Sequence, residues 1–172
     1  MLRIIGAFCI IVGSTGIGLW YREQLKTALS HLRYMKRLLE LFSGEIRYQK
    51  AALPECCRQI GEKAKEPYRT ALLMIYEELK MQDGCGFAEK WRKIMEGALD
   101  TLPLTGGEKE LFLGCFGGYE FSDGVTQQRM LEQSKDMLAA AIGGREASLE
   151  KQGHLAAGLG VMGGMLLTVL LL

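Results

Sequence analysis

The sequence has very few of the residues that usually carry enzymatic or metal chemistry. It holds two histidines, His31 and His154, and neither has a cysteine or a second histidine at metal-ligand spacing. It also has no Walker A lysine motif, no G-x-G-x-x-G and no G-x-S-x-G. No set of polar residues suggests an active site. We therefore expect no catalytic residues, no metal and no cofactor, and a scaffold or interaction protein in place of an enzyme.

Cysteine use and net charge exclude two further classes. There are five cysteines, an odd number, and Cys56 and Cys57 are adjacent. This pattern does not fit a disulfide framework and is typical of a reducing compartment, where we expect both residues to be structural. The formal net charge of +1 gives no reason to expect a nucleic-acid partner.

Charge is missing from both ends of the chain. Residues 4–20 and 155–172 contain no charged side chain, and 40 of the 41 Asp, Glu, Lys and Arg residues lie in residues 21–154. Eighteen helical residues span about 27 Å, close to the roughly 30 Å of a bilayer core. We predict an N-terminal transmembrane helix at residues 1–20, a helical domain at 21–154 and a C-terminal transmembrane helix at 155–172.

The charges next to these runs predict the orientation of the chain. Only Arg3 precedes the first run, whereas five basic residues follow it: Arg22, Lys26, Arg33, Lys36 and Arg37. A cleaved signal peptide carries its positive charge in front of the apolar run, so we favour a retained anchor. Basic flanks stay on the cytoplasmic side, which predicts a cytoplasmic domain with both termini outside. The five basic residues form a candidate patch that faces either anionic lipid or a protein partner.

The middle of the chain has the periodicity of helices. No stretch alternates apolar and polar residues as a half-buried strand would. We expect an all-α fold, with a bundle of about six helices held between the two transmembrane segments. Two long helices should continue from the uncharged ends, and shorter helices should start near Pro54, Pro67, Phe87 and Thr105. Thr105 and Glu108 have capping-box spacing.

The first long helix carries a heptad of apolar residues, which should form the spine of the bundle. Its seam positions and the residues that widen the stripe are Leu25, Ala28, Leu29, Leu32, Met35, Leu38, Leu39, Leu41, Phe42 and Ile46. Packing within the chain is the default, and dimerisation through this heptad stays open as an alternative. The last long helix should start after Asp123 and be weakened or kinked at Gly143-Gly144. In the predicted C-terminal transmembrane helix, small residues spaced four apart favour close packing of membrane helices: Ala156, Gly160 and Gly164.

Three segments resemble the stage III sporulation protein AB family of endospore-forming bacteria. They are the opening MLRIIGAFCIIVGSTGIGLWYREQL, the stretch GEIRYQKAALPECCRQI, and the closing GLGVMGGMLLTVLLL. The most specific piece resembles the family's acidic-Ile-x-Tyr…Leu-Pro-Glu pattern, and its positions here are Glu45, Ile46, Tyr48, Leu53, Pro54 and Glu55.

The resemblance implies a role that the residue patterns alone do not indicate. It implies a subunit of a channel complex between mother cell and forespore, located in the mother-cell membrane around the forespore. It also implies a fold similar to the cytoplasmic domain of type II secretion platform proteins. The implied partners are a secretion-type ATPase and other membrane subunits of the channel. The alternative from the residues is a membrane-anchored regulatory adaptor or sensor unrelated to transport.

Overall fold

The computed structural model describes residues 2–49, 53–81, 84–117 and 124–171. Side chains are described for residues 20, 22–47, 53–81, 84–117 and 128–151. These residues form six α-helices and no strand, which confirms the all-α prediction. The elements are α1 (Leu2–Gly44), a π-helical turn η1 (Glu45–Gln49), α2 (Leu53–Lys63), α3 (Tyr68–Lys80), α4 (Phe87–Asp100), α5 (Gly106–Leu113), a 3₁₀ turn η2 (Gly114–Phe116) and α6 (Gly124–Leu171).

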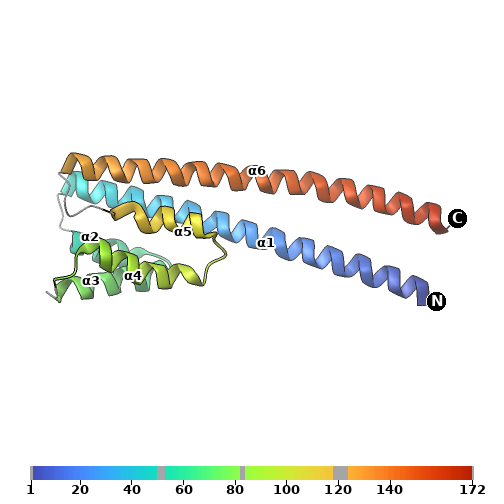
Figure 1. Cartoon of the computed structure of the whole chain (residues 1–172), viewed down its shortest axis with the longest axis horizontal. Helices are drawn as coiled ribbons and strands as arrows, with labels where there is room; N and C mark the ends of the chain where they lie inside the picture. Colours follow the sequence, from blue (N-terminus) through green and yellow to red (C-terminus); the bar gives the residue numbers. More distant parts are fainter. Residues whose placement is uncertain (1, 50–52, 82–83, 118–123, 172) are drawn as a thin grey trace.

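Two long helices dominate the shape of the molecule. Figure 1 shows α1 and α6 side by side, with α5 against them and α2, α3 and α4 forming a second layer. The N-terminal part of α1 and the C-terminal part of α6 project beyond the four short helices, so both termini lie at the same end. The short helices thus form a bundle around only one half of the α1–α6 pair.

The heptad of α1 forms the spine of this bundle, as predicted. The seam residues are almost fully buried, from Leu25 at one end to Phe42 at the other, and Ile46 packs against the core. The predicted stripe is wrong at one position. Leu41 is 45% exposed, because the helical repeat places it on the outer face of α1 one turn after Arg37. The α-helical hydrogen-bonding pattern also ends at Gly44 and passes into the π-helical turn, which apolar spacing alone does not reveal.

An aromatic cluster joins the two layers. Trp91 of α4 is fully buried, and its ring packs against Phe42 of α1 and against Phe112 and Phe116 of the α5–η2 segment. Its indole Nε1 donates to the Phe112 carbonyl at 3.3 Å, so the polar atom of the ring is satisfied. Because these rings come from four elements, the cluster fixes how α4 and α5 sit on the spine.

The short helices begin close to the predicted positions. Pro54 lies in the first turn of α2, Pro67 is the N-cap of α3, and α4 begins at Phe87. The predicted capping box is confirmed at the start of α5, where the Thr105 side chain accepts from the backbone N–H of Glu108 and Glu108 accepts from the backbone N–H of Thr105. The last helix continues through Gly143-Gly144 as one element.

The two uncharged ends of the chain are helical. Residues 2–20 belong to α1 and residues 155–171 to α6. Among the residues that the structure describes, no helix has the length and apolar character needed to cross a membrane. The side chains of residues 1–19 and 152–172 lie outside the described residues, and so do those of Ala156, Gly160 and Gly164.

Candidate functional site

The motif residues meet where α1 ends and α2 begins. Ile46 in the π-helical turn and Leu53 at the start of α2 are both half-buried and pack against the same core. Pro54 and Glu55 occupy the first turn of α2, where a proline and a carboxylate both favour a helix start. The side chain of Tyr48 lies outside the described residues. The structure therefore brings five of the six motif positions, the first of them at the start of the π-helical turn, into one corner.

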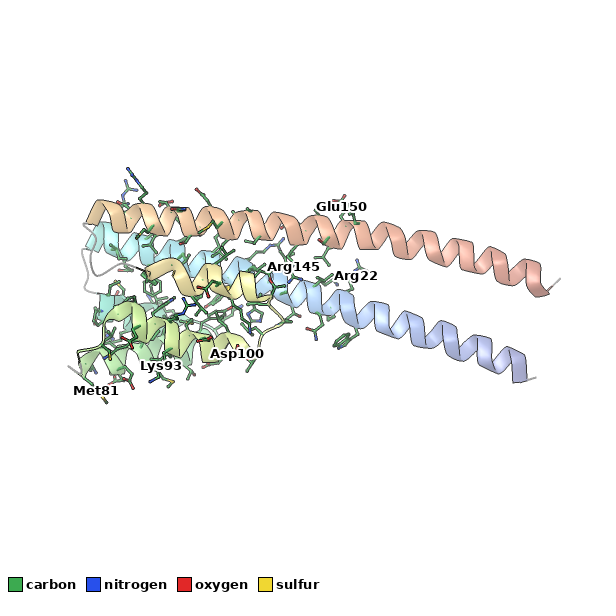
Figure 2. The ribbon with its side chains drawn as sticks, in the orientation of Figure 1. Arg22, Met81, Lys93, Asp100, Arg145 and Glu150 are labelled. Atoms are coloured by element: carbon green, nitrogen blue, oxygen red, sulfur yellow. The ribbon has the colours of Figure 1, made fainter. Side chains whose placement is uncertain are left out.

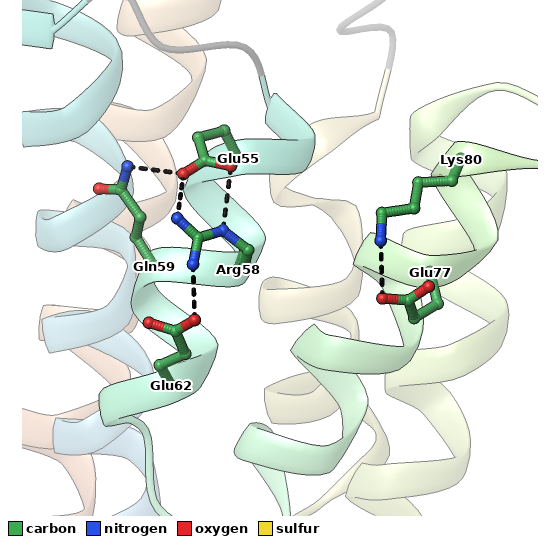
Figure 3. A network of polar contacts seen from close by, with 6 residues as sticks. All are labelled: Glu55, Arg58, Gln59, Glu62, Glu77 and Lys80. Atoms are coloured by element: carbon green, nitrogen blue, oxygen red, sulfur yellow. Dashed lines mark hydrogen bonds and ion pairs between the residues drawn. The ribbon is translucent and has the colours of Figure 1, made fainter.

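Glu55 begins a network of polar contacts on the outer surface of α2 (Figure 3). Its carboxylate accepts from the Arg58 guanidinium at 2.5 and 3.1 Å and from the Gln59 amide at 3.0 Å. A second carboxylate, that of Glu62, accepts from Arg58 Nη1 at 2.6 Å. The hydrogen bonds from Arg58 and Gln59 lower the pKa of Glu55 to about 2, and Glu55 in turn raises the pKa of Arg58. Glu55 is therefore ionised at neutral pH, because its partners stabilise the charged form.

Glu45 differs from Glu55 in its surroundings. The sequence suggests Arg47, Lys50 or Arg58 as a partner for it, but Arg58 pairs with Glu55 and Glu62 instead. Within the described residues, Oε2 of Glu45 is buried without a hydrogen-bond partner. Its negative charge adds to the raised pKa of Cys56, although burial of that thiol is the larger cause and brings the value to about 11.

The three buried cysteines are inert in this environment. Cys56, Cys57 and Cys115 are almost completely inaccessible, and burial raises the pKa of each thiol. A protonated, buried thiol is a poor nucleophile and a poor metal ligand. Within the described part of the chain, no group of three or more His, Cys, Asp or Glu side chains is arranged to hold a metal ion.

His31 joins α1 to the start of α3. Its Nδ1 lies 3.2 Å from the Tyr68 hydroxyl, and partial burial lowers the pKa of the imidazole. One turn further, the Tyr34 hydroxyl accepts from the backbone N–H of Lys65 at 2.7 Å. These two contacts set the axial position of α3 relative to α1, so His31 has a structural role.

The basic patch lies on the outer face of α1. At 100° per residue its five members share an arc of roughly 100°. Part of its charge is neutralised, since Lys26 pairs with Glu23 at 3.8 Å and Lys36 with Glu40 at 3.7 Å, both at exposed positions. Arg33 reaches across to Glu146 of α6 at 2.5 Å. Within the described residues, Arg22 and Arg37 form no ion pair.

A second ion pair lies beside the Arg33–Glu146 pair, near the point where α1 and α6 leave the bundle. Arg145 of α6 donates from Nε and Nη2 to both carboxylate oxygens of Glu108, at 2.6 and 2.8 Å (Figure 2 labels Arg145). The hydrogen bonds from Arg145 are the main reason why the pKa of Glu108 falls to about 2. Two consecutive residues of α6 therefore form ion pairs with different helices: Arg145 with α5 and Glu146 with α1. Sequence reasoning finds Glu108 through the capping box but gives no indication of its partner 37 positions away.

An apolar hollow lies between α3 and α4. It is an open groove of about 610 Å³, with a floor formed mainly by Pro67, Ala71, Met74, Ile94 and Ala98. A smaller hollow continues along α3 to Met81. Met74 is 52% and Met81 63% exposed, and neither is among the residues that the sequence singled out.

The family comparison agrees with this all-helical architecture. The family model described as stage III sporulation protein AB matches residues 3–172. The chain belongs to the stage III sporulation protein AB family. A curated stage III sporulation protein AB from Bacillus subtilis (strain 168) is 25% identical over 173 residues, which cover all of both chains. A solved structure, stage III sporulation protein AB (SpoIIIAB), is 19% identical, with a TM-score of 0.66 over 72% of this chain and 97% of that one.

These matches confirm the resemblance inferred from the three sequence segments. The solved structure supports the fold of the bundle, and the family model extends over both uncharged ends. The family thus supports a role in sporulation for this stage III sporulation protein AB family member.

Proposed function

We propose that this chain is a non-enzymatic platform subunit of a sporulation channel complex, anchored in the mother-cell membrane with its bundle in the cytoplasm. In this role it couples a secretion-type ATPase on the cytoplasmic side to the membrane subunits of the channel. Family membership supports the sporulation setting.

One observation carries the proposal. The parts of α1 and α6 that project beyond the short helices contain residues 4–20 and 155–171 of the two uncharged runs, and they lie side by side (Figure 1). Two apolar helices that leave a domain at one end are suited to enter a bilayer together. The basic residues Arg22 and Lys26 follow directly after the first run, which favours a cytoplasmic bundle.

The ion pairs near the exit of the long helices support the coupling. Glu108–Arg145 joins α6 to α5, and Arg33–Glu146 joins α6 to α1. A displacement of the bundle by a docked motor would therefore be passed to both long helices through contacts that do not depend on apolar packing alone. A platform subunit requires this kind of mechanical continuity between its cytoplasmic surface and its anchors.

Complementation in a sporulating strain that lacks the gene tests the anchoring and the role together. We expect the full chain to restore spore formation and residues 21–154 alone to fail. The matched control carries Arg69→Glu, an exposed change on α3 that leaves both runs intact, and it should rescue. Rescue by the spanless version at equal abundance would contradict the proposed anchoring, and normal sporulation of the deletion strain would contradict the role.

Pull-down of the ATPase with the full chain in detergent tests the docking partner. We expect Lys36→Glu with Arg37→Glu to reduce ATPase capture, because it reverses two charges of the outer basic face. Lys63→Glu with Arg69→Glu is the matched control, since both residues are exposed and lie away from that face. Unchanged capture by the Lys36→Glu, Arg37→Glu variant would indicate that the patch faces lipid. Failure of the unaltered chain to capture the ATPase would contradict the proposal that the ATPase is its partner.

A further inference from the structure

We infer that the connection between α4 and α5, residues 101–105, rests on the lipid headgroups of the membrane that anchors the chain. This contact depends on the proposed anchoring through residues 4–20 and 155–172, and it adds a third point at which the chain meets the bilayer. Two membrane-spanning helices alone leave the tilt of the bundle open, because tilt is set by packing and by contacts at the interface. A third contact would fix it.

The α4–α5 connection lies at the end of the bundle from which the two long helices project (Figure 1). Its level along α1 follows from the contacts of α5. Glu108 lies near the level of Arg33, because their partners on α6 are consecutive residues. The η2 turn after α5 packs against Phe42, nine positions beyond Arg33, so α5 runs parallel to α1. At about 1.5 Å per residue, the tip of the connection, roughly five residues before Glu108, is about level with residue 28 of α1.

The boundary of the hydrocarbon layer would lie close to this level. Because α1 and α6 are antiparallel, residue 155, nine positions after Glu146, lies level with residue 24, nine positions before Arg33. The uncharged run of α1 ends at Trp20 and that of α6 begins at residue 155, so the boundary falls between the levels of residues 20 and 24. The tip of the connection is therefore about 6–12 Å beyond the boundary. A headgroup layer is roughly 5–8 Å thick, so the tip reaches it.

The α4–α5 connection has no charged side chain, unlike the other connection at this end of the bundle. Residues 101–107 are uncharged, and three of them are half-buried, so that part of each apolar side chain stays open to the surroundings: Leu102, Pro103 and Leu104. The α2–α3 connection carries Lys65 and Glu66, both exposed. The hydrogen bond from Lys65 to Tyr34 places it about 9 Å further from the membrane. The connection nearest to the membrane is thus the apolar one.

Two residues of α1 have the properties of an interface at the same layer. Trp20 is 65% exposed, and an indole is favourable at the level of the headgroups. Arg22, two positions later, is exposed, and a guanidinium there can donate to lipid phosphates. The long helix therefore presents an aromatic ring and a cation to the layer that the α4–α5 connection reaches.

Fluorescence quenching in vesicles tests the contact. The full chain carries Cys9→Ser and Cys85→Ser, a small fluorophore is attached at Pro103→Cys, and the phosphatidylcholine vesicles contain lipid with a headgroup nitroxide. The matched control is Lys65→Cys in the same background, an exposed site on the charged connection. We expect at least about twofold more quenching at position 103 than at position 65, because position 65 stands about 9 Å further back. Native Cys85, in the α3–α4 turn, should show no quenching when it alone is labelled.

The possible failures of this experiment are distinguishable. Equal quenching at positions 103 and 65 would overturn the inference, because the bundle would then stand clear of the headgroups. A chain that vesicles do not retain would instead contradict the proposed anchoring. Circular dichroism shows whether each labelled chain keeps its helices. Gly106→Cys, an exposed site with open space for a side chain, replaces Pro103→Cys if that variant does not fold.

The depth of Trp20 provides a second test without a label. The chain has two tryptophans, and Trp20→Phe leaves only Trp91, which is buried inside the bundle. The difference between the unaltered chain and Trp20→Phe therefore isolates the emission of Trp20. We expect nitroxides at the top of the acyl chain to quench it at least about twofold more than nitroxides near the bilayer centre. Stronger quenching by the central nitroxides would place the boundary at a different level from the one that the two runs define, and would overturn the inference.

Discussion

The ion pair between Glu108 and Arg145 gives a prediction with a defined magnitude and pH dependence. The perturbation is Glu108→Gln, which removes the charge but keeps an oxygen that can accept from the backbone N–H of Thr105. The Glu108 side chain is 10% exposed and that of Arg145 18%, so the pair lies mostly out of solvent. Loss of the carboxylate leaves a guanidinium without its main counter-charge, which is costly at a buried site.

The magnitude follows from the pKa of Glu108. Its pKa is 4.5 in the unfolded chain and about 2 in the folded chain. At pH values above both, this difference corresponds to at most about 3 kcal/mol of folding stability. Because the pair lies at the edge of the bundle and solvent reaches part of it, we expect Glu108→Gln to lower the free energy of unfolding by about 2 kcal/mol at pH 7.

The sign of the pH dependence is fixed by the direction of the shift. The pKa is lowered in the folded chain, so the unfolded chain binds the proton more readily. The contribution of Glu108 is therefore complete above pH 4.5 and is lost as the pH falls from 4.5 toward about 2. The stability difference between the unaltered chain and Glu108→Gln should shrink over the same interval.

Urea unfolding of the full chain in mild detergent, followed by Trp91 fluorescence, measures this difference. A Trp20→Phe background leaves Trp91 as the only tryptophan, because the chain has two. Glu110→Gln is the control on the same helix. Its partner Arg92 lies 2.7 Å away, but both side chains are more than half exposed, so we expect a change of about 0–1 kcal/mol. Equal stability of Glu108→Gln and the unaltered chain at pH 7, or a difference that persists at pH 2, would refute the reasoning.

Further predictions concern packing and are measured by the same unfolding assay. Gly61→Val should destabilise by about 1–3 kcal/mol, since even a Cβ there would lie 3.1 Å from Leu72, whereas Gly97→Ala has open space and should be neutral or slightly stabilising. Lys90→Met should cost about 1–2 kcal/mol, because the buried ammonium donates to two carbonyls at the end of α3. Leu39→Ala should cost about 2–5 kcal/mol and Leu41→Ala less than about 0.5, and similar values for the two would contradict the assigned spine face.

Most of the fold could be predicted because its determinants are local. Pro54, Pro67 and the Thr105–Glu108 capping box mark helix starts within a few residues of where the structure has them. The heptad of α1 predicts its buried face, since helical periodicity and burial coincide along a spine helix. Leu41 shows the limit of that reasoning. Hydrophobicity alone placed it in the core, whereas its angular position on the helix puts it outside.

The surface features could not be predicted because they depend on pairs distant in sequence. The Glu108–Arg145 and Arg33–Glu146 pairs join residues 37 and 113 positions apart, and no local pattern distinguishes these charges from others on the same helices. The groove between α3 and α4 likewise arises from how two helices sit side by side. The motif corner was located from sequence, yet the separate environments of Glu45 and Glu55 follow only from the packing of α2 on the π-helical turn.

The two interhelix ion pairs add to the apolar packing a preference for one register of the long helices. The Glu108–Arg145 pair contributes more, because its side chains are 10% and 18% exposed, whereas those of Arg33 and Glu146 are 59% and 48% exposed. Arg145 and Glu146 are consecutive, so their side chains leave α6 about 100° apart and reach different helices. A rotation of α6, or a shift by one turn, would separate both pairs at once. The Glu108 carboxylate therefore serves both the capping box of α5 and the contact between α5 and α6.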